Sequence, residues 1–95
     1  MKYTEAEAEL LKRHTKNGRI QTLPRKPSKQ KILLQIIIRD FENGKVYNEQ
    51  EVNSVLMRWY DDYVILRRSL VDAKLLNRED DGSSYVVNLD LYKEA

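Results

Sequence analysis

The sequence predicts an α+β domain that is mainly helical and closes with a β-hairpin. Three observations in residues 48–87 lead to this class: two amphipathic helical segments, a short break between them, and two strand-like segments around a turn signal. Apolar residues recur at helical spacing in both helical segments. They are Val52, Val55, Leu56 and Trp59 in the first, and Tyr63, Leu66, Leu70 and Ala73 in the second. Helix, turn, helix and hairpin in this order are typical of a winged helix-turn-helix, with a three-helix core and a β-hairpin wing.

An extra N-terminal helix is predicted over residues 1–18. Thr4 and Glu7 have the spacing of a capping box, and the thin apolar face consists of Leu10, Leu11 and Ala6. We expect this helix to run to about Lys16, with Asn17-Gly18 as its stop signal.

A basic connector containing two prolines follows over residues 19–28. Arg19 to Leu23 is expected to be extended, and Pro24 and Pro27 then exclude regular structure. Residues 29–87 form the predicted winged-helix domain. Residues 88–95 are a C-terminal strand or tail, because apolar and polar side chains alternate there.

The first core helix is predicted from Lys29 to Phe41, with Ser28 as its cap and Asn43-Gly44 as its end. Its apolar positions lie all around the helix, at 32, 33, 34, 36, 37, 38 and 41. Such a helix is buried centrally or covered on two sides. The covering element is either the N-terminal helix or a second copy of the chain.

The remaining elements follow from caps and turn signals. A very short strand at Val46-Tyr47 leads into a helix that Asn48 caps with Glu51. Asp61-Asp62 supplies the cap of the next helix. The hairpin strands, 75–78 and 85–87, flank the turn Asp81-Gly82.

Charge is distributed unevenly along these 95 residues. The net charge is +2, but residues 1–31 carry nine Lys or Arg against three Glu, and residues 32–95 carry eight against twelve acids. Between Lys12 and Lys31 there are eight basic residues and no acid. This arm is either a phosphate-binding segment or a solvated basic surface.

In a DNA-bound winged helix, the second helix of the pair enters the major groove. Here that helix spans roughly Asp62 to Lys74. The candidate DNA-binding residues are the basic side chains of this helix and of the connector: Arg67, Arg68, Lys74, Arg19, Arg25, Lys26, Lys29 and Lys31. As structural alternatives, Arg68 pairs with Asp72 four residues on, and Arg67 bridges to Glu51 or another acid.

Acidic residues argue against ordinary DNA binding. Asp61 and Asp62 lie at the start of the predicted recognition helix, and Glu79, Asp80 and Asp81 lie at the wing tip. Both clusters would repel phosphates. They favour the alternative of a winged-helix module for protein interaction or dimerisation.

Several classes of function lack support. The chain has no cysteine, and His14, its single histidine, has no carboxylate pair nearby in the sequence, so no metal, cofactor or Ser-His triad is expected. We therefore do not expect an enzyme. Without a secretory signal or an apolar run long enough to span a bilayer, a cytoplasmic protein is expected. Trp59 is expected to pack in the core, and the alternative is a small-effector groove lined by Trp59, Tyr60 and Tyr63.

Two motifs resemble a bacterial family that is still called a domain of unknown function. They are Asn17–Lys26 and Tyr47–Asn53, the second followed by Asp62 and Leu66–Asp72, and the resemblance covers 17–87. That family occurs alone or behind ArsR-like and MarR-like regulator domains. The resemblance implies a winged-helix-like fold and a link to transcription regulation, and it brings no catalytic residues.

The chain departs from the family pattern in lacking an attached DNA-binding domain and in a longer tail past the hairpin. We expect a DNA-binding transcriptional regulator that acts as a dimer. The alternative is an interaction module whose partner is a second copy or a regulator protein.

Overall fold

A computed structural model describes residues 3–80 and 83–87 of the chain. This part of the chain contains four α-helices and two small antiparallel sheets, which confirms the α+β class. In chain order the elements are α1 (Glu5–His14), β1 (Thr15–Lys16), β2 (Arg19–Ile20), α2 (Pro27–Ile38), β3 (Tyr47–Asn48), α3 (Glu49–Met57), α4 (Tyr63–Asp72), β4 (Leu76–Arg78) and β5 (Ser84–Val87).

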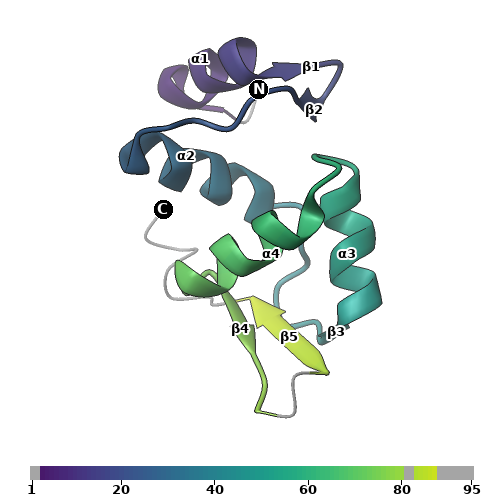
Figure 1. Cartoon of the computed structure of the whole chain (residues 1–95). Coiled ribbons are helices and arrows are strands. Elements are labelled where there is room, and N and C mark those ends of the chain that lie inside the picture. The colour runs from purple at the N-terminus through teal and green to yellow at the C-terminus, as the bar shows by residue number, and fades with distance from the viewer. Residues whose placement is uncertain (1–2, 81–82, 88–95) are drawn as a thin grey trace.

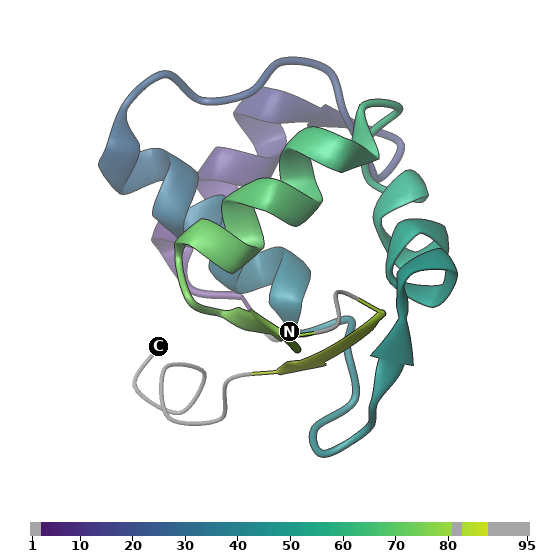
Figure 2. The same cartoon turned by 60° about the horizontal axis from the view of Figure 1, so that its bottom comes forward.

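The helix α2 lies at the centre of the helical layer, between α1 and α4, and α3 packs against α4 (Figures 1 and 2). The expectation that this apolar helix is covered on two sides is confirmed, and α1 is one of the covering elements. Ile36, Ile37 and Ile38 are at most 1% exposed, so the end of α2 anchors the core. Residues from all four helices and from the hairpin strands complete the core.

The first helix begins as predicted and ends earlier. The capping box is confirmed: the Glu7 backbone N donates to Thr4 Oγ1 at 3.1 Å, and the Thr4 N donates to Glu7 Oε1 at 3.0 Å. The predicted end at Lys16 was wrong, because β1 pairs with β2 in a hairpin. Asn17 (φ 55°) and Gly18 (φ 79°) both adopt positive φ, as a type I′ hairpin turn requires. This Asn-Gly pair therefore turns a hairpin rather than stopping a helix.

The apolar face of α1 also differs from the prediction. Leu10 is buried and Leu11 is partly buried, but Ala6 is exposed. The buried charged residue on this helix is Glu7, for which the sequence spacing predicted only a capping role. It faces the end of α2, as described below.

The second helix starts two residues before the predicted Lys29. Pro27 occupies its first turn and Lys26 is the N-cap without a side-chain cap hydrogen bond, so the Ser28 cap was wrong. Proline fits this position because its fixed φ is helical and its missing N–H would be unpaired there. The α-helix ends at Ile38, and i→i+3 hydrogen bonds continue the turn to Phe41, whose N donates to the Ile38 carbonyl at 3.1 Å.

The strand before α3 is shifted by one residue from the predicted Val46-Tyr47. It pairs with β5 through Tyr47 and Tyr85, so the second sheet has the order β3-β5-β4. The caps of the next two helices are confirmed: Asn48 forms a capping box with Glu51, and Asp62 caps α4. The hairpin strands form as expected, whereas the turn Asp81-Gly82 and the predicted tail 88–95 lie outside the described residues.

Trp59 lies beyond the end of α3, in the turn that precedes α4. Its Nε1 donates to Asp40 Oδ2 at 2.7 Å, and the ring is partly buried against the core, as are Tyr60 and Tyr63. The expected core packing of Trp59 is thus confirmed, although α3 ends at Met57 and Trp59 is not on the helix as its place in the predicted apolar stripe implied.

Candidate nucleic-acid interface

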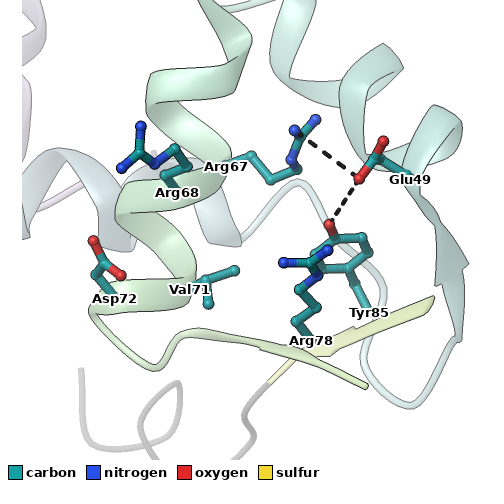
Figure 3. A pocket seen from close by; sticks show the side chains of 7 residues that line it. All are labelled: Glu49, Arg67, Arg68, Val71, Asp72, Arg78 and Tyr85. Carbon is teal, nitrogen blue, oxygen red and sulfur yellow. Dashed lines mark hydrogen bonds and ion pairs between the residues drawn. The ribbon is translucent and has the colours of Figure 1, made fainter. Parts of the chain in front are cut away.

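A groove lies between α4 and the β4–β5 hairpin. It has a volume of about 320 Å³ and contains three arginines, two from α4 and one from β4 (Figure 3). Its lining residues are Glu49, Arg67, Arg68, Val71, Asp72, Arg78 and Tyr85. We call it the wing groove.

Arg67 is bound to other residues of the domain. It donates to Asn53 Oδ1 and lies 4.0 Å from Glu49 Oε1, and its side chain is only 17% exposed. The structural alternative for this residue is thus confirmed, with Glu49 in the place of Glu51. The Tyr85 hydroxyl donates to the same Glu49 oxygen at 3.1 Å, and burial, followed by this hydrogen bond, raises the pKa of Tyr85.

Arg68 lies differently from its neighbour. It is exposed, and in residues 3–80 and 83–87 it makes no ion pair with Asp72, so the alternative pairing was wrong. Figure 3 shows that Arg68 and Asp72 leave α4 on the side away from Glu49, whereas Arg67, Glu49, Tyr85 and Arg78 point toward one another. Arg68 is therefore available to a ligand at the rim of the wing groove.

Sequence reasoning missed Arg78. It is exposed on β4, opposite Tyr85 on β5, and this pairing brings it to the wing groove. Arg78 ends the predicted strand 75–78. The expected pairing of that strand with residues 85–87 was the signal that could have placed Arg78 beside Tyr85.

Lys74 is exposed just after α4. Its φ of 64° is left-handed, and the Leu75 N donates to the Leu70 carbonyl at 3.0 Å, as in a Schellman cap. Lysine thus occupies a position where glycine is usual.

Arg19 lies at the turn between α3 and α4. Its guanidinium donates to the Met57 carbonyl at 2.7 Å and to the Asp61 carboxylate. The neighbouring Ile20 N donates to the Trp59 carbonyl at 2.7 Å. Strand β2 therefore satisfies carbonyl groups at the end of α3, and the Arg19 charge offsets one of the two acids at the start of α4.

The connector runs beside α4, on the side away from the hairpin. Leu23 and Pro24 line a largely apolar hollow of about 390 Å³ together with Ile65, Ser69 and Asp72 of α4. In Figure 2, α4 crosses in front of α2. The connector between β2 and α2 runs above α4, and the β4–β5 hairpin lies below it. The basic connector thus lies near the predicted recognition helix.

The eight predicted site residues fall into separate groups. Arg67 and Arg68 line the wing groove, whereas Arg25, Lys26 and Lys29 line a third hollow beside α1. Lys31 is exposed on α2. The structure does not gather the eight residues into one site.

None of the helices within residues 3–80 and 83–87 has the length and apolar character that a bilayer span requires. The same residues contain no cluster of three or more acidic or histidine side chains suited to a metal ion.

The chain is a small α+β domain in which the wing groove holds three arginines between α4 and the β4–β5 hairpin. Residues 19–87 match the model of a family described as an uncharacterized protein conserved in bacteria (DUF2087), and the chain belongs to this family. No curated protein and no solved structure matches the chain.

Proposed function

We propose that this domain is a winged helix-turn-helix that binds duplex DNA, with α4 in the major groove and the β4–β5 hairpin as the wing. The observation that carries the proposal is the order α2, β3, α3, α4, β4, β5, together with the pairing of β3 to the hairpin strand β5. A helix-turn-helix followed by a hairpin is a recurring DNA-binding arrangement.

The arginines of the wing groove support DNA as the ligand. Arg68 and Arg78 are exposed, and their planar guanidinium groups suit guanine edges and phosphates. Arg67, in contrast, is tied to Asn53 and Glu49. We therefore assign direct DNA contact to Arg68 and Arg78, and the positioning of α4 against α3 to Arg67.

The two acids at the start of α4 repel phosphates less than free carboxylates would, because both have partners within the domain. Asp61 is paired with Arg19, and Asp62 accepts a hydrogen bond from the Ile65 N at 3.4 Å as the helix cap. The exposed wing acids Glu79 and Asp80 still oppose phosphate contact near the tip. We thus centre the interface on α4 and the base of the wing.

The family resemblance extends the proposal to transcription regulation, because relatives are expected behind ArsR-like and MarR-like domains. A two-fold symmetric operator requires two copies of the domain, which is why a homodimer belongs to this proposal.

Fluorescence anisotropy with labelled duplex DNA at low and moderate salt tests the proposal. We expect salt-sensitive binding, and the variant Arg68→Ala/Arg78→Ala should make the log–log salt slope less steep by about two units. The matched control Lys12→Ala/Lys16→Ala removes the same charge from α1 and β1, outside the wing groove. No salt-sensitive binding at micromolar protein, or equal losses in both variants, would reject DNA binding through the wing groove.

Exposed apolar side chains favour a second candidate, a protein-interaction module. Val64 and Ile65 on α4 are 39% and 43% exposed, and Met57 at the end of α3 is 45% exposed. Apolar surface of this kind is common at protein interfaces. Val64→Lys separates the candidates: it should reduce self-association in sedimentation experiments if α4 is a protein interface, but preserve or strengthen binding if α4 meets DNA.

A further inference from the structure

The hollow beside α1, on the other side of the connector from α4, is also basic. It has a volume of about 280 Å³ and is formed by α1, the connector and the first turn of α2. Its charged and titratable lining residues are Glu9, Arg13, His14, Arg25, Lys26 and Lys29. We call it the connector groove. Pro24 separates it from the apolar hollow beside α4, because that residue lines both.

The charge of the connector groove is strongly positive. Four Arg or Lys side chains line it against a single carboxylate, Glu9. That carboxylate lies 3.6 Å from Arg13, and both side chains are more than 60% exposed, so the pair is weak. In the described residues, Arg25, Lys26 and Lys29 have no ion-pair partner. Like charges around one hollow repel one another unless an anion lies between them.

The walls of the connector groove are held by hydrogen bonds between its three elements. The His14 ring Nδ1 lies 3.0 Å from the Thr22 carbonyl oxygen and 3.1 Å from Thr22 Oγ1, which ties the end of α1 to the connector. The Gln21 N donates to the His14 carbonyl at 2.7 Å. Gln30 Nε2 donates to the Pro24 carbonyl at 2.9 Å, which ties the connector to α2.

These bonds have two effects on the connector groove. They fix the backbone that carries the basic side chains, so less ordering is needed when a ligand binds. One of them also engages the carbonyl oxygen of Pro24, a lining residue whose partial negative charge would otherwise oppose an anion. The groove is left with flexible cationic donors on a fixed frame.

We propose that the connector groove binds a phosphoanion that carries two or more phosphate groups, through Arg13, Arg25, Lys26 and Lys29. Guanidinium and ammonium groups around a small hollow match the oxygens of adjacent phosphates. The phosphates come either from a free ligand or from the backbone of a bound duplex. The groove is separate from the wing groove, so binding of a free phosphoanion does not depend on the proposed function.

Pyrophosphate is the probe for the first test. It is titrated into the full-length ¹⁵N-labelled chain at low ionic strength, and amide chemical shifts are followed by NMR. We expect saturable shifts at His14, Lys26 and Lys29. The variant Lys26→Ala/Lys29→Ala should weaken binding about tenfold or more, because charge-assisted hydrogen bonds are lost.

The matched control is Lys12→Ala/Lys16→Ala, which removes the same charge from residues that do not line the connector groove. All four lysines are exposed, so neither variant should lower the melting temperature appreciably. Absence of saturable shifts would overturn the proposal if the chain binds no DNA, or if Lys26→Ala/Lys29→Ala leaves the salt slope of DNA binding unchanged. So would an equal loss of pyrophosphate binding in the control variant.

A second measurement identifies the source of the phosphates, and this arm rests on the proposed function. If the duplex backbone fills the groove, Lys26→Ala/Lys29→Ala should make the salt slope of DNA binding less steep by about two units, and pyrophosphate should compete with DNA. If a free phosphoanion is the ligand, the slope is unchanged and pyrophosphate binds alongside DNA. A wild-type chain that binds pyrophosphate but no DNA rejects the DNA proposal and leaves the phosphoanion site intact.

Discussion

Glu7 on α1 and Arg39 at the end of α2 form a two-point ion pair that joins the N-terminal helix to the core. Arg39 Nη1 donates to Glu7 Oε1 at 3.1 Å, and Nη2 donates to the other carboxylate oxygen. The Glu7 side chain is 7% exposed and that of Arg39 is 30% exposed. The hydrogen bond from Arg39 holds the pKa of Glu7 below its ordinary value, against the opposing effect of burial.

Replacing Glu7 by Gln should therefore lower the free energy of unfolding at neutral pH by roughly 1.5–3 kcal/mol, the range for hydrogen bonds to charged groups. Glutamine preserves the capping box, so the loss reports on the ion pair. Because the folded-state pKa of Glu7 is lowered, its stabilisation is present above the unfolded-state value and disappears as the pH falls through the folded value.

Urea unfolding of wild type and Glu7→Gln from pH 7 down to pH 3 measures this effect, and the two stabilities should converge at acidic pH. Glu5→Gln is the control, since Glu5 is also in the first turn of α1 but is exposed. Equal losses in both variants would mean that helix-dipole effects, and not Arg39, account for the change.

Arg67 and Arg68, which are adjacent on α4, should contribute very differently to stability. Arg67→Ala removes the hydrogen bond to Asn53 and the ion pair with Glu49, so the free energy of unfolding should fall by roughly 1.5–3 kcal/mol. Arg68→Ala changes an exposed residue without an ion pair in the described part of the chain, so its stability should stay within about 0.5 kcal/mol of wild type. Thermal and urea unfolding of both variants test this contrast. Comparable destabilisation by the two substitutions would contradict the assigned roles.

Lys74 offers a test in which stability and binding should change in opposite directions. Lys74→Gly relieves a left-handed backbone at the end of α4 and should stabilise the domain by roughly 1 kcal/mol. If the Lys74 side chain meets DNA, the same variant should bind DNA more weakly despite its higher melting temperature. Lys74→Ala, which removes the charge but leaves the strained backbone, separates the two effects. A variant Lys74→Gly that is no more stable than Lys74→Ala would refute the strain argument.

Arg19 should affect DNA binding through Asp61. Arg19→Gln leaves the exposed Asp61 charge at the start of α4 without its ion-pair partner and should weaken binding roughly two- to fivefold, the range of exposed charge pairs, while Asp61→Asn should strengthen it. The double variant should bind much like Asp61→Asn, because Arg19 then has no acid to offset. Anisotropy titrations of the four proteins give the coupling directly. Strictly additive effects would show that Arg19 does not act through Asp61.

Local signals in the sequence predicted the elements well where one residue type satisfies one backbone requirement. Asn48 with Glu51, Thr4 with Glu7, and Asp62 each cap the helix that was expected. Errors arose where a local signal fits two structures. Asn17-Gly18 is suitable both for the end of a helix and for a hairpin turn, and the pairing of Thr15 with Ile20 decides between them.

The candidate site was harder to predict because it depends on contacts between residues far apart in the chain. Arg19 and Asp61 are 42 positions apart, and Arg67 meets Asn53 and Glu49 only once α3 packs against α4. Net charge and spacing identified the basic residues, but not which of them are already paired. Arg78 was missed because only the register of β4 against β5 brings it to α4.

The β1–β2 hairpin determines where this chain can be shortened without loss of contacts to the core. The family match starts at Arg19, on the second strand of that hairpin. A fragment excised at this boundary would keep β2, and with it the hydrogen bonds to Met57 and Trp59, but would lose the partner strand, helix α1 and Glu7. One side of the isoleucine-rich α2 would then face water. We therefore expect residues 19–87 alone to be less stable than the full chain, because α1 and Glu7 lie outside the segment that the family model matches.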